Sequence, residues 1–195
     1  MDTPLTTPVE AKRALRARLW AARKQRYADT SRAERETQAQ ALADHALRVV
    51  ADRVAPGGTV TSYESWPTEP GTEPLNEALV AAGYRVLVPV TLPGLDLDWR
   101  PLGSDELDEA ARLGLEAIGQ ADLVLTPGTA VDRRGVRLGQ GGGCYDRALP
   151  RRRDGVRVVT LLHPQELLDE ELPSAEHDQR VDAVVTADGI TWLDR

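Results

Sequence analysis

Apolar residues near the start of the chain recur at the three- and four-residue spacing of a helix. Leu15, Leu19 and Ala22 follow this spacing. Before them, Thr7 is a capping residue, Pro8 suits the first helical position, and Glu10 completes a capping box. The pattern therefore predicts a helix that begins at Pro8. Seven lysine and arginine residues lie between Glu10 and Arg26, so this helix is strongly basic.

A second capping box, Ser31 with Glu34, precedes a long helix that should end near Arg53, before a Pro-Gly-Gly sequence. Beyond it, apolar residues gather in short β-like runs at residues 59–63, 84–90, 96–102, 122–126, 156–162 and 182–186. Helical patterns lie at 75–82, where Gly83 should stop the helix, and at 106–118.

Strands that alternate with helices indicate an α/β fold, with a mostly parallel sheet and helices on both faces. In such sheets ligands bind beyond the carboxyl ends of the strands. We expect residues 1–195 to form one domain, because no linker-like segment divides them.

Composition narrows the possible partners. The formal net charge of −7 disfavours binding of the whole protein to nucleic acid. No apolar run approaches the roughly 20 residues of a membrane span, and residues 1–10 carry no apolar signal core. A single cysteine, Cys144, rules out a disulfide framework and fits a reducing compartment. We therefore expect a cytoplasmic protein that binds neither nucleic acid nor membrane.

One segment concentrates glycine to an unusual degree. Residues 137–146 read Arg-Leu-Gly-Gln-Gly-Gly-Gly-Cys-Tyr-Asp. Each glycine forfeits roughly 0.5–1 kcal/mol of stability relative to alanine, and in return it allows positive φ and a close approach of backbone N–H groups to a ligand. Successive N–H groups that face inward form an anion-binding nest. Arg137 can donate to a phosphate, and Asp146 can hold Mg²⁺ on it.

Other interpretations of this segment stay open. It is not a P-loop, which ends in Gly-Lys-Ser/Thr, nor a dinucleotide fingerprint, which would have Gly or Ala where Cys144 stands. A surface turn is the plain alternative, although a turn needs only one or two glycines. Cys144 is a conceivable nucleophile, but the three histidines are distant in sequence.

With these residues in place, the chain resembles the 5-formyltetrahydrofolate cyclo-ligases, also called 5,10-methenyltetrahydrofolate synthetases. Four blocks carry the resemblance, in the order of the family and over nearly the whole chain: residues 12–16, 63–72, 125–147 and 171–182. The third block, which contains the glycine-rich segment, is highly specific. The resemblance implies the fold of the ribose-5-phosphate isomerase, glucosamine-phosphate isomerase and CoA transferase-like group, in a protein that we expect to be a monomer.

The resemblance also implies a reaction that depends on ATP and Mg²⁺. ATP phosphorylates the formyl oxygen of 5-formyltetrahydrofolate, N10 attacks the activated carbon, and loss of phosphate gives 5,10-methenyltetrahydrofolate with ADP and phosphate. Matching positions assign the ATP contacts to Lys12, Arg16, Arg137, Leu138, Gly139, Gln140, Gly141, Gly142, Gly143, Cys144 and Tyr145. The metal ligands would be Asp146 and Asp178, and the folate contacts Glu69, Glu64 and Tyr145.

Three residues depart from the family pattern: Cys144 replaces an aromatic residue, Val131 replaces a phenylalanine, and Glu64 stands where an apolar contact is usual. We expect the other basic residues of the first helix to lie on the surface, Asp132 to stabilise a turn, and His177 to be structural. Two alternative functions remain. A sugar-phosphate isomerase would share the anion nest but would need no Lys12 and Arg16, and a non-catalytic nucleotide- or RNA-binding relative would use the basic helix.

Overall fold

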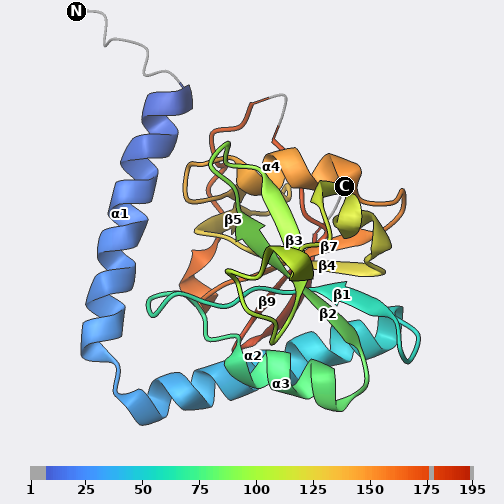
Figure 1. Ribbon diagram of the computed structural model, residues 1–195. Helices are drawn as coiled ribbons and strands as arrows, with labels where there is room; N and C mark the ends of the chain where they lie inside the picture. Colours follow the sequence, from blue (N-terminus) through green and yellow to red (C-terminus); the bar gives the residue numbers. More distant parts are fainter. Residues whose placement is uncertain (1–7, 176–177, 194–195) are drawn as a thin grey trace, which may run out of the picture.

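The two predicted N-terminal helices are present in the computed structural model, which describes residues 8–175 and 178–193. Helix α1 (Pro8–Asp29) stands beside the body of the molecule, and α2 (Arg32–Arg53) runs beneath it (Figure 1). The capping box is confirmed, because the Ser31 hydroxyl accepts the Glu34 N–H at 3.2 Å and the Glu34 carboxylate accepts the Ser31 N–H at 2.9 Å. The predicted cap Thr7 lies outside the described residues.

The body is built on a mixed, largely parallel seven-stranded sheet, as the alternating pattern predicts. The strand order is β10-β9-β7-β4-β1-β2-β3. The five inner strands are parallel: β1 (Thr59–Thr61), β2 (Arg85–Thr91), β4 (Leu123–Pro127), β7 (Arg157–Leu161) and β9 (Ala183–Thr186). The two edge strands are antiparallel: β3 (Leu97–Pro101) and β10 (Gly189–Trp192). Strand β10, which forms a hairpin with β9, was not predicted.

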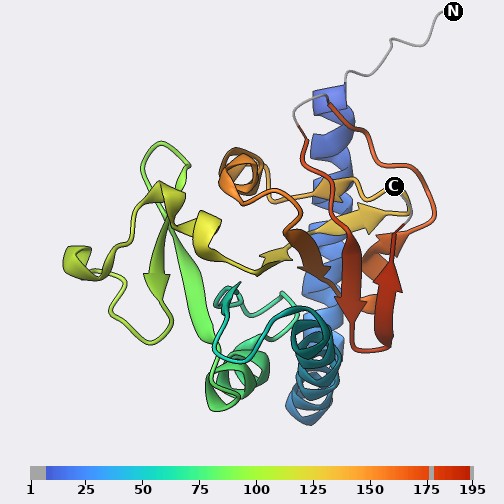
Figure 2. The ribbon, with the colours of Figure 1, turned by 90° about the vertical axis from the view of Figure 1, so that its right-hand side faces the viewer.

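Helical segments cover both faces of this sheet (Figure 2). On one face, α2 and α3 (Glu73–Ala81) bury their apolar sides against the strands. On the other face the cover is made of short turns: η2 (Leu115–Gln120), α4 (Cys144–Ala148) and η3 (Leu149–Arg151). The helical pattern at 106–118 thus forms two 3₁₀ turns, η1 (Glu109–Ala111) and η2, because Gly114 separates them with a φ of +85°.

A second, small sheet was not predicted from the sequence. It joins β6 (Arg137–Leu138), β5 (Ala130–Asp132) and β8 (Leu167–Leu168), and a 3₁₀ turn, η4 (Pro164–Glu166), precedes β8. Leu15 and Leu19 of α1 pack against the apolar side chains of this region. The prediction that Ala22 shares the apolar face of α1 with Leu15 and Leu19 is wrong, because Ala22 is exposed. Helix α1 therefore rests on the small sheet and not on the main one.

The first strand ends earlier than the apolar pattern suggests. Beyond Thr61, the Tyr63 carbonyl accepts side-chain hydrogen bonds from Thr72 Oγ1 at 2.7 Å and Asn76 Nδ2 at 3.0 Å. These bonds turn the chain into the 64–72 loop and start α3 at Glu73, two residues before the predicted beginning. The end is as expected, since Gly83 has a φ of +83°. Of the helices described, none is both long and apolar enough to cross a membrane.

The expectation that the remaining basic residues of α1 lie on the surface is wrong for Arg23. Its side chain is 3% exposed and forms an ion pair with Glu166. Arg23 shares the helix face of Leu19 and Arg16, at separations of four and seven residues, and this face is turned toward the body. Composition reveals charge but not which face of the helix is covered.

Candidate active site

A cleft of about 430 Å³ lies beyond the carboxyl ends of the parallel strands, as expected for this class of sheet. Tyr63 follows β1, Thr91 ends β2, and Gly128 follows β4. Among the predicted site residues, the cleft is lined by Glu64, Glu69, Arg137, Gly139, Gln140, Gly142, Gly143, Cys144, Tyr145 and Asp146. The structure thus brings most of the predicted folate and ATP contacts to one cavity.

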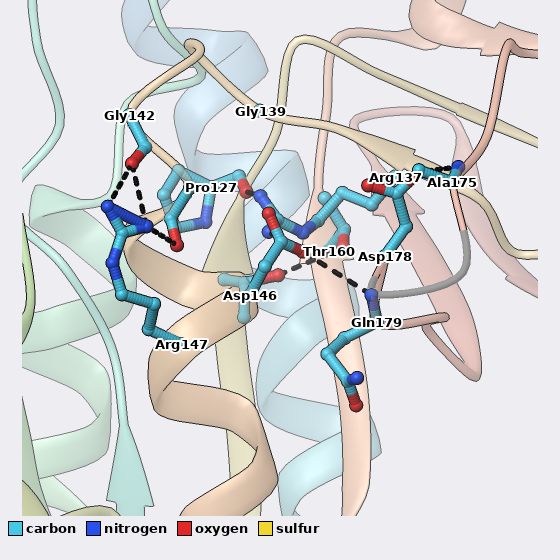
Figure 3. A network of polar contacts seen from close by, with 12 residues as sticks. Pro127, Arg137, Gly139, Gly142, Asp146, Arg147, Thr160, Ala175, Asp178 and Gln179 are labelled. Carbon is cyan, nitrogen blue, oxygen red and sulfur yellow. Dashed lines mark hydrogen bonds and ion pairs between the residues drawn. The ribbon is translucent and has the colours of Figure 1, made fainter. Parts of the chain in front are cut away.

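The glycine-rich segment forms the loop between β6 and α4. Gly141 and Gly143 have φ values of +111° and +67°, the conformation that the glycine content predicts. Arg147 holds the loop from outside, because its guanidinium donates to the carbonyls of Gly142 and Gly143 at 2.9–3.0 Å (Figure 3). These hydrogen bonds tie the loop, which forms part of the cleft wall, to α4.

Arg137 lies at the base of this loop with its side chain 3% exposed. Its NH2 group is 3.3 Å from Asp146 Oδ1, and its NH1 group donates to the Pro127 carbonyl at 3.3 Å. The guanidinium also lies over the Tyr145 ring, 5.4 Å from the centroid. Both contacts to oxygen are long, so the cation is placed in the cleft without a tight ion pair that a ligand would have to break.

Helix α1 brings Lys12 and Arg16 to the same region. Lys12 Nζ donates to the Asp178 carboxylate at 2.5 and 2.8 Å, and Arg16 Nε donates to the Gly139 carbonyl at 2.8 Å. Burial lowers the pKa of Arg16, and the nearby charges of Asp178 and Asp146 oppose that shift. Two cations from the N-terminal helix therefore meet the glycine loop and both predicted metal ligands.

Asp146 and Asp178 offer two carboxylates, which suits Mg²⁺ better than a metal ion that takes all of its ligands from the protein. The Gln179 N–H points to Asp146 Oδ1 at 3.4 Å, so the segment that carries Asp178 lies beside Asp146 (Figure 3). Within residues 8–175 and 178–193, no group of three His, Cys, Asp or Glu side chains is placed to hold a metal ion. Mg²⁺ usually takes one or two carboxylates and completes its shell with water and substrate phosphates.

Glu69, a predicted folate contact, is hydrogen-bonded to the glycine-rich loop. Its carboxylate accepts the Trp66 N–H at 2.9 Å and the Gln140 amide N–H at 2.7 Å. Burial raises the pKa of Glu69, while the Trp66 N–H, the positive charge of Arg23 and the Gln140 amide act in the opposite direction. Since Gln140 belongs to the glycine-rich loop, the predicted ATP and folate contacts share a wall.

Glu64 points to Arg100, with which it forms a short ion pair. The Arg100 side chain is buried, and it also donates to the Ser104 carbonyl at 2.8 Å. The negative charge of Glu64, where the family usually has an apolar residue, is therefore paired with the positive charge of Arg100 from β3. Arg100 carried no signal in the sequence, because its partner is 36 residues away.

Several buried polar atoms in the cleft lack partners within the described part of the chain: the hydroxyls of Tyr63 and Tyr145 and the Nε atoms of Arg100 and Arg137. Burial raises the pKa of both phenols, so they remain protonated donors. A buried polar group without a partner costs about 1–3 kcal/mol. The four residues line the cleft, whereas Trp99, Arg112 and Thr129, which hold the other such atoms, do not. Tyr63 was not among the predicted site residues.

Several predicted residues do not line the cavity: Lys12, Arg16, Leu138, Gly141 and Asp178. The Leu138 side chain is buried beneath α1, and Gly141 faces Arg16. Cys144 is half-buried, and its Sγ atom packs beside Gly142. The turn at Asp132 is confirmed, because its carboxylate accepts the backbone N–H groups of Arg134, Val136 and Leu172 at 2.9–3.0 Å. The predicted structural residue His177 falls outside the described residues.

Fold and site together define an α/β protein in which a glycine loop lines the cleft and is met by basic residues of an N-terminal helix and two carboxylates. Residues 8–187 match the model of the 5-formyltetrahydrofolate cyclo-ligase family. The chain belongs to this family. It is 38% identical over 146 residues to a 5-formyltetrahydrofolate cyclo-ligase of Mycolicibacterium smegmatis, covering 67% of this chain and 74% of the relative. For the Escherichia coli K12 protein of the same name the identity is 35% over 144 residues, with 66% and 77% covered.

Solved structures agree on the fold. A 5,10-methenyltetrahydrofolate synthetase from Mycoplasma pneumoniae superposes with a TM-score of 0.72 at 19% identity, covering 90% of this chain and 98% of that one. The corresponding Aquifex aeolicus protein gives 0.70 at 21%, with 93% and 94% covered.

Proposed function

We propose that this chain converts 5-formyltetrahydrofolate to 5,10-methenyltetrahydrofolate with ATP and Mg²⁺, releasing ADP and phosphate. The family to which it belongs comprises ATP-dependent ligases of folate and one-carbon metabolism. The observation that carries the proposal is the meeting of Lys12 and Arg16 with the glycine loop and two carboxylates.

The reaction needs an activated oxygen. A formyl oxygen on nitrogen is a poor leaving group, and phosphorylation turns it into a good one. Phosphoryl transfer requires positioning and neutralisation of charge more than covalent help from the protein. Arg137 is already held at the base of the loop, and Lys12 and Arg16 approach the loop from α1. These three cations would neutralise the phosphates of ATP. The backbone N–H groups of residues 139–143 would surround the phosphates.

The metal would be held by Asp146 and Asp178. Bound Mg²⁺ supplies positive charge on the phosphates. Asp178 is the carboxylate that Lys12 contacts and Asp146 the one that Arg137 contacts. Each proposed metal ligand is thus paired with a proposed phosphate contact, so a Mg²⁺–nucleotide complex can replace the two ion pairs with new partners for all four side chains.

The folate would occupy the end of the cleft lined by Tyr63, Glu69 and Arg100. Glu69 is suited to hydrogen-bond the pterin or the N10 region, because it is fixed by Trp66 and Gln140. The Tyr145 ring lies between this end and Arg137, where it can line the space between the two ligands. The hydroxyls of Tyr63 and Tyr145 supply donors without partners in the described structure.

The placement of α1 favours this function over the alternatives. A sugar-phosphate isomerase has no need of two cations brought to the loop by a separate helix. A nucleic-acid binder would keep its basic residues free on the surface, whereas Lys12 and Arg16 face the cleft loop and its carboxylates.

The test is direct. Purified protein is mixed with 5-formyltetrahydrofolate, Mg²⁺ and ATP, and the near-ultraviolet absorbance of the methenyl product is followed. We expect turnover that requires both ATP and Mg²⁺. Arg16→Gln should lower it at least tenfold, about 1.4 kcal/mol of barrier. Arg18→Gln is the matched control on the same helix, because Arg18 is exposed and should not affect turnover. Absence of an ATP-dependent signal at enzyme-like concentrations would overturn the proposal.

A further inference from the structure

Helix α1 carries two proposed phosphate contacts, yet it is poorly attached to the protein. It stands along the side of the body (Figure 1). Among its side chains at residues 9–29, only that of Arg23 is buried. Its side chains that pack against a buried apolar cluster are the partly buried Leu15 and Leu19. The orientation of α1, and with it the position of Lys12 and Arg16, must therefore depend strongly on polar contacts.

Arg23 makes the most extensive of these contacts. Its Nε and NH2 groups donate to the two oxygens of Glu166, each at 2.7 Å, and NH2 also donates to the Gly128 carbonyl at 2.6 Å. Glu166 is 1% exposed and accepts the His163 N–H at 3.1 Å, while Arg26 reaches it at 3.3 Å. The planar fork of arginine fits a carboxylate in two places at once, so this pair fixes both distance and angle.

Other polar contacts of α1 include the exposed Arg18–Glu170 ion pair at 3.9 Å and two contacts with the site itself. Lys12 binds Asp178 and Arg16 binds the Gly139 carbonyl. Both side chains are proposed to turn to phosphate when ATP is bound, and then their present bonds no longer hold the helix. Glu166 does not line the cleft. The Arg23–Glu166 pair therefore persists whether or not nucleotide is bound.

Because Lys12 lies far along α1 from Arg23, a small change in the angle of the helix at Arg23 displaces Lys12 strongly. Lys12, Arg16 and Arg23 are separated by four and seven residues, so they lie along one face of α1. At 1.5 Å per residue, Lys12 lies about 16 Å along the axis from Arg23. A tilt of about 5° at Arg23 would shift Lys12 by roughly 1.4 Å, and displacements near 1 Å can cost 10²-fold in rate.

We propose that Arg23 and Glu166 are positioning residues that fix the angle of α1 and thereby set the affinity for ATP. This inference rests on the proposed function. Arg23 does not line the proposed ATP cleft, so we expect it to act through Lys12 and Arg16. A purely structural role would lower stability and leave the kinetics at moderate temperature unchanged, and the two roles can be separated by measurement.

Arg23→Lys is the main variant, because it keeps the positive charge beside Glu166 and Glu69 but loses the fork. We expect the KM for ATP to rise at least fivefold and the KM for 5-formyltetrahydrofolate to change less than twofold. Arg23→Met should raise the KM for ATP further. Val49→Ala is the control, since Val49 belongs to the buried face of α2 and its truncation destabilises the core without touching α1. An unchanged KM for ATP in Arg23→Lys overturns the inference.

A double variant tests the route of the effect. If Arg23 acts by placing Lys12, adding Arg23→Met to Lys12→Met should raise the KM for ATP less than Arg23→Met does alone. Full additivity contradicts positioning through Lys12. Binding of Mg²⁺–ATP, measured by calorimetry on the same variants, keeps this test separate from the proposed function. Wild-type protein that binds ATP but forms no methenyl product would refute the function, while weaker ATP binding by Arg23→Lys would still support the inference.

Discussion

Replacing Tyr145 by phenylalanine should raise the stability of the free protein and lower its affinity for 5-formyltetrahydrofolate. The Tyr145 hydroxyl is buried in the cleft wall and has no partner in the described structure. Removing such a group relieves about 1–3 kcal/mol, the cost of a buried polar atom without a hydrogen bond. The ring contacts remain, because phenylalanine keeps the edge contact with Trp99 and the cation–π contact with Arg137.

The expected magnitudes follow. A gain of about 1 kcal/mol raises the melting temperature of a protein of this size by about 2–4 °C. If the hydroxyl donates to bound substrate, its loss removes a hydrogen bond of about 1 kcal/mol. That difference corresponds to about fivefold in affinity. Tyr63→Phe should behave in the same way, since its hydroxyl is also buried in the cleft without a partner.

Thermal unfolding monitored by circular dichroism measures the first effect, and the KM for 5-formyltetrahydrofolate measures the second. Tyr84→Phe is the control, because Tyr84 is half-buried on the α2–α3 side of the sheet, away from the cleft. A fall in melting temperature for Tyr145→Phe, together with unchanged kinetics, would refute the reasoning. It would mean that the hydroxyl is satisfied in the free protein and does not serve the ligand.

Further predictions concern the other residues of the cleft. Arg137→Ala and Asp146→Ala should each lower turnover at least tenfold, about 1.4 kcal/mol, and full activity in either would contradict the loop assignment. Cys144→Ser should keep most activity, because Sγ only packs beside the loop; a dead variant would revive a nucleophilic role. Burial raises the pKa of Glu69, so its carboxylate destabilises the fold increasingly as pH rises above its ordinary value of 4.5. Glu69→Gln should therefore unfold at higher temperature than wild type at pH 7, with an advantage that shrinks toward pH 4, while its activity falls. Asp178→Asn should raise the Mg²⁺ concentration needed for half-maximal rate.

Local chemistry decided much of the fold. The Ser31–Glu34 capping box and the stop at Gly83 depend on neighbours within a few residues, so the sequence predicts them correctly. The apolar runs at 122–126 and 156–162 identified strands of the parallel sheet for the same reason, since period and length suffice there. Strand β10 and the small sheet were missed because their strands have only two to four residues and lie outside the apolar runs that marked the equally short strands β1 and β9.

The candidate site likewise has features that the sequence predicts and features that only the structure shows. Its glycine loop was evident from the sequence, because four glycines within five positions are expensive and demand an explanation. The pairing of Glu64 with Arg100, the buried hydroxyl of Tyr63 and the contact of Arg23 with Glu166 were not, because each depends on segments that are far apart along the chain or on which face is covered. Arg23 and Arg18 are both arginines of one basic helix, yet one is buried and the other is exposed. The sequence by itself determined the long helices, most strands of the main sheet and the glycine-rich loop; the tertiary structure decided which charges are buried, because burial depends on what packs against each face.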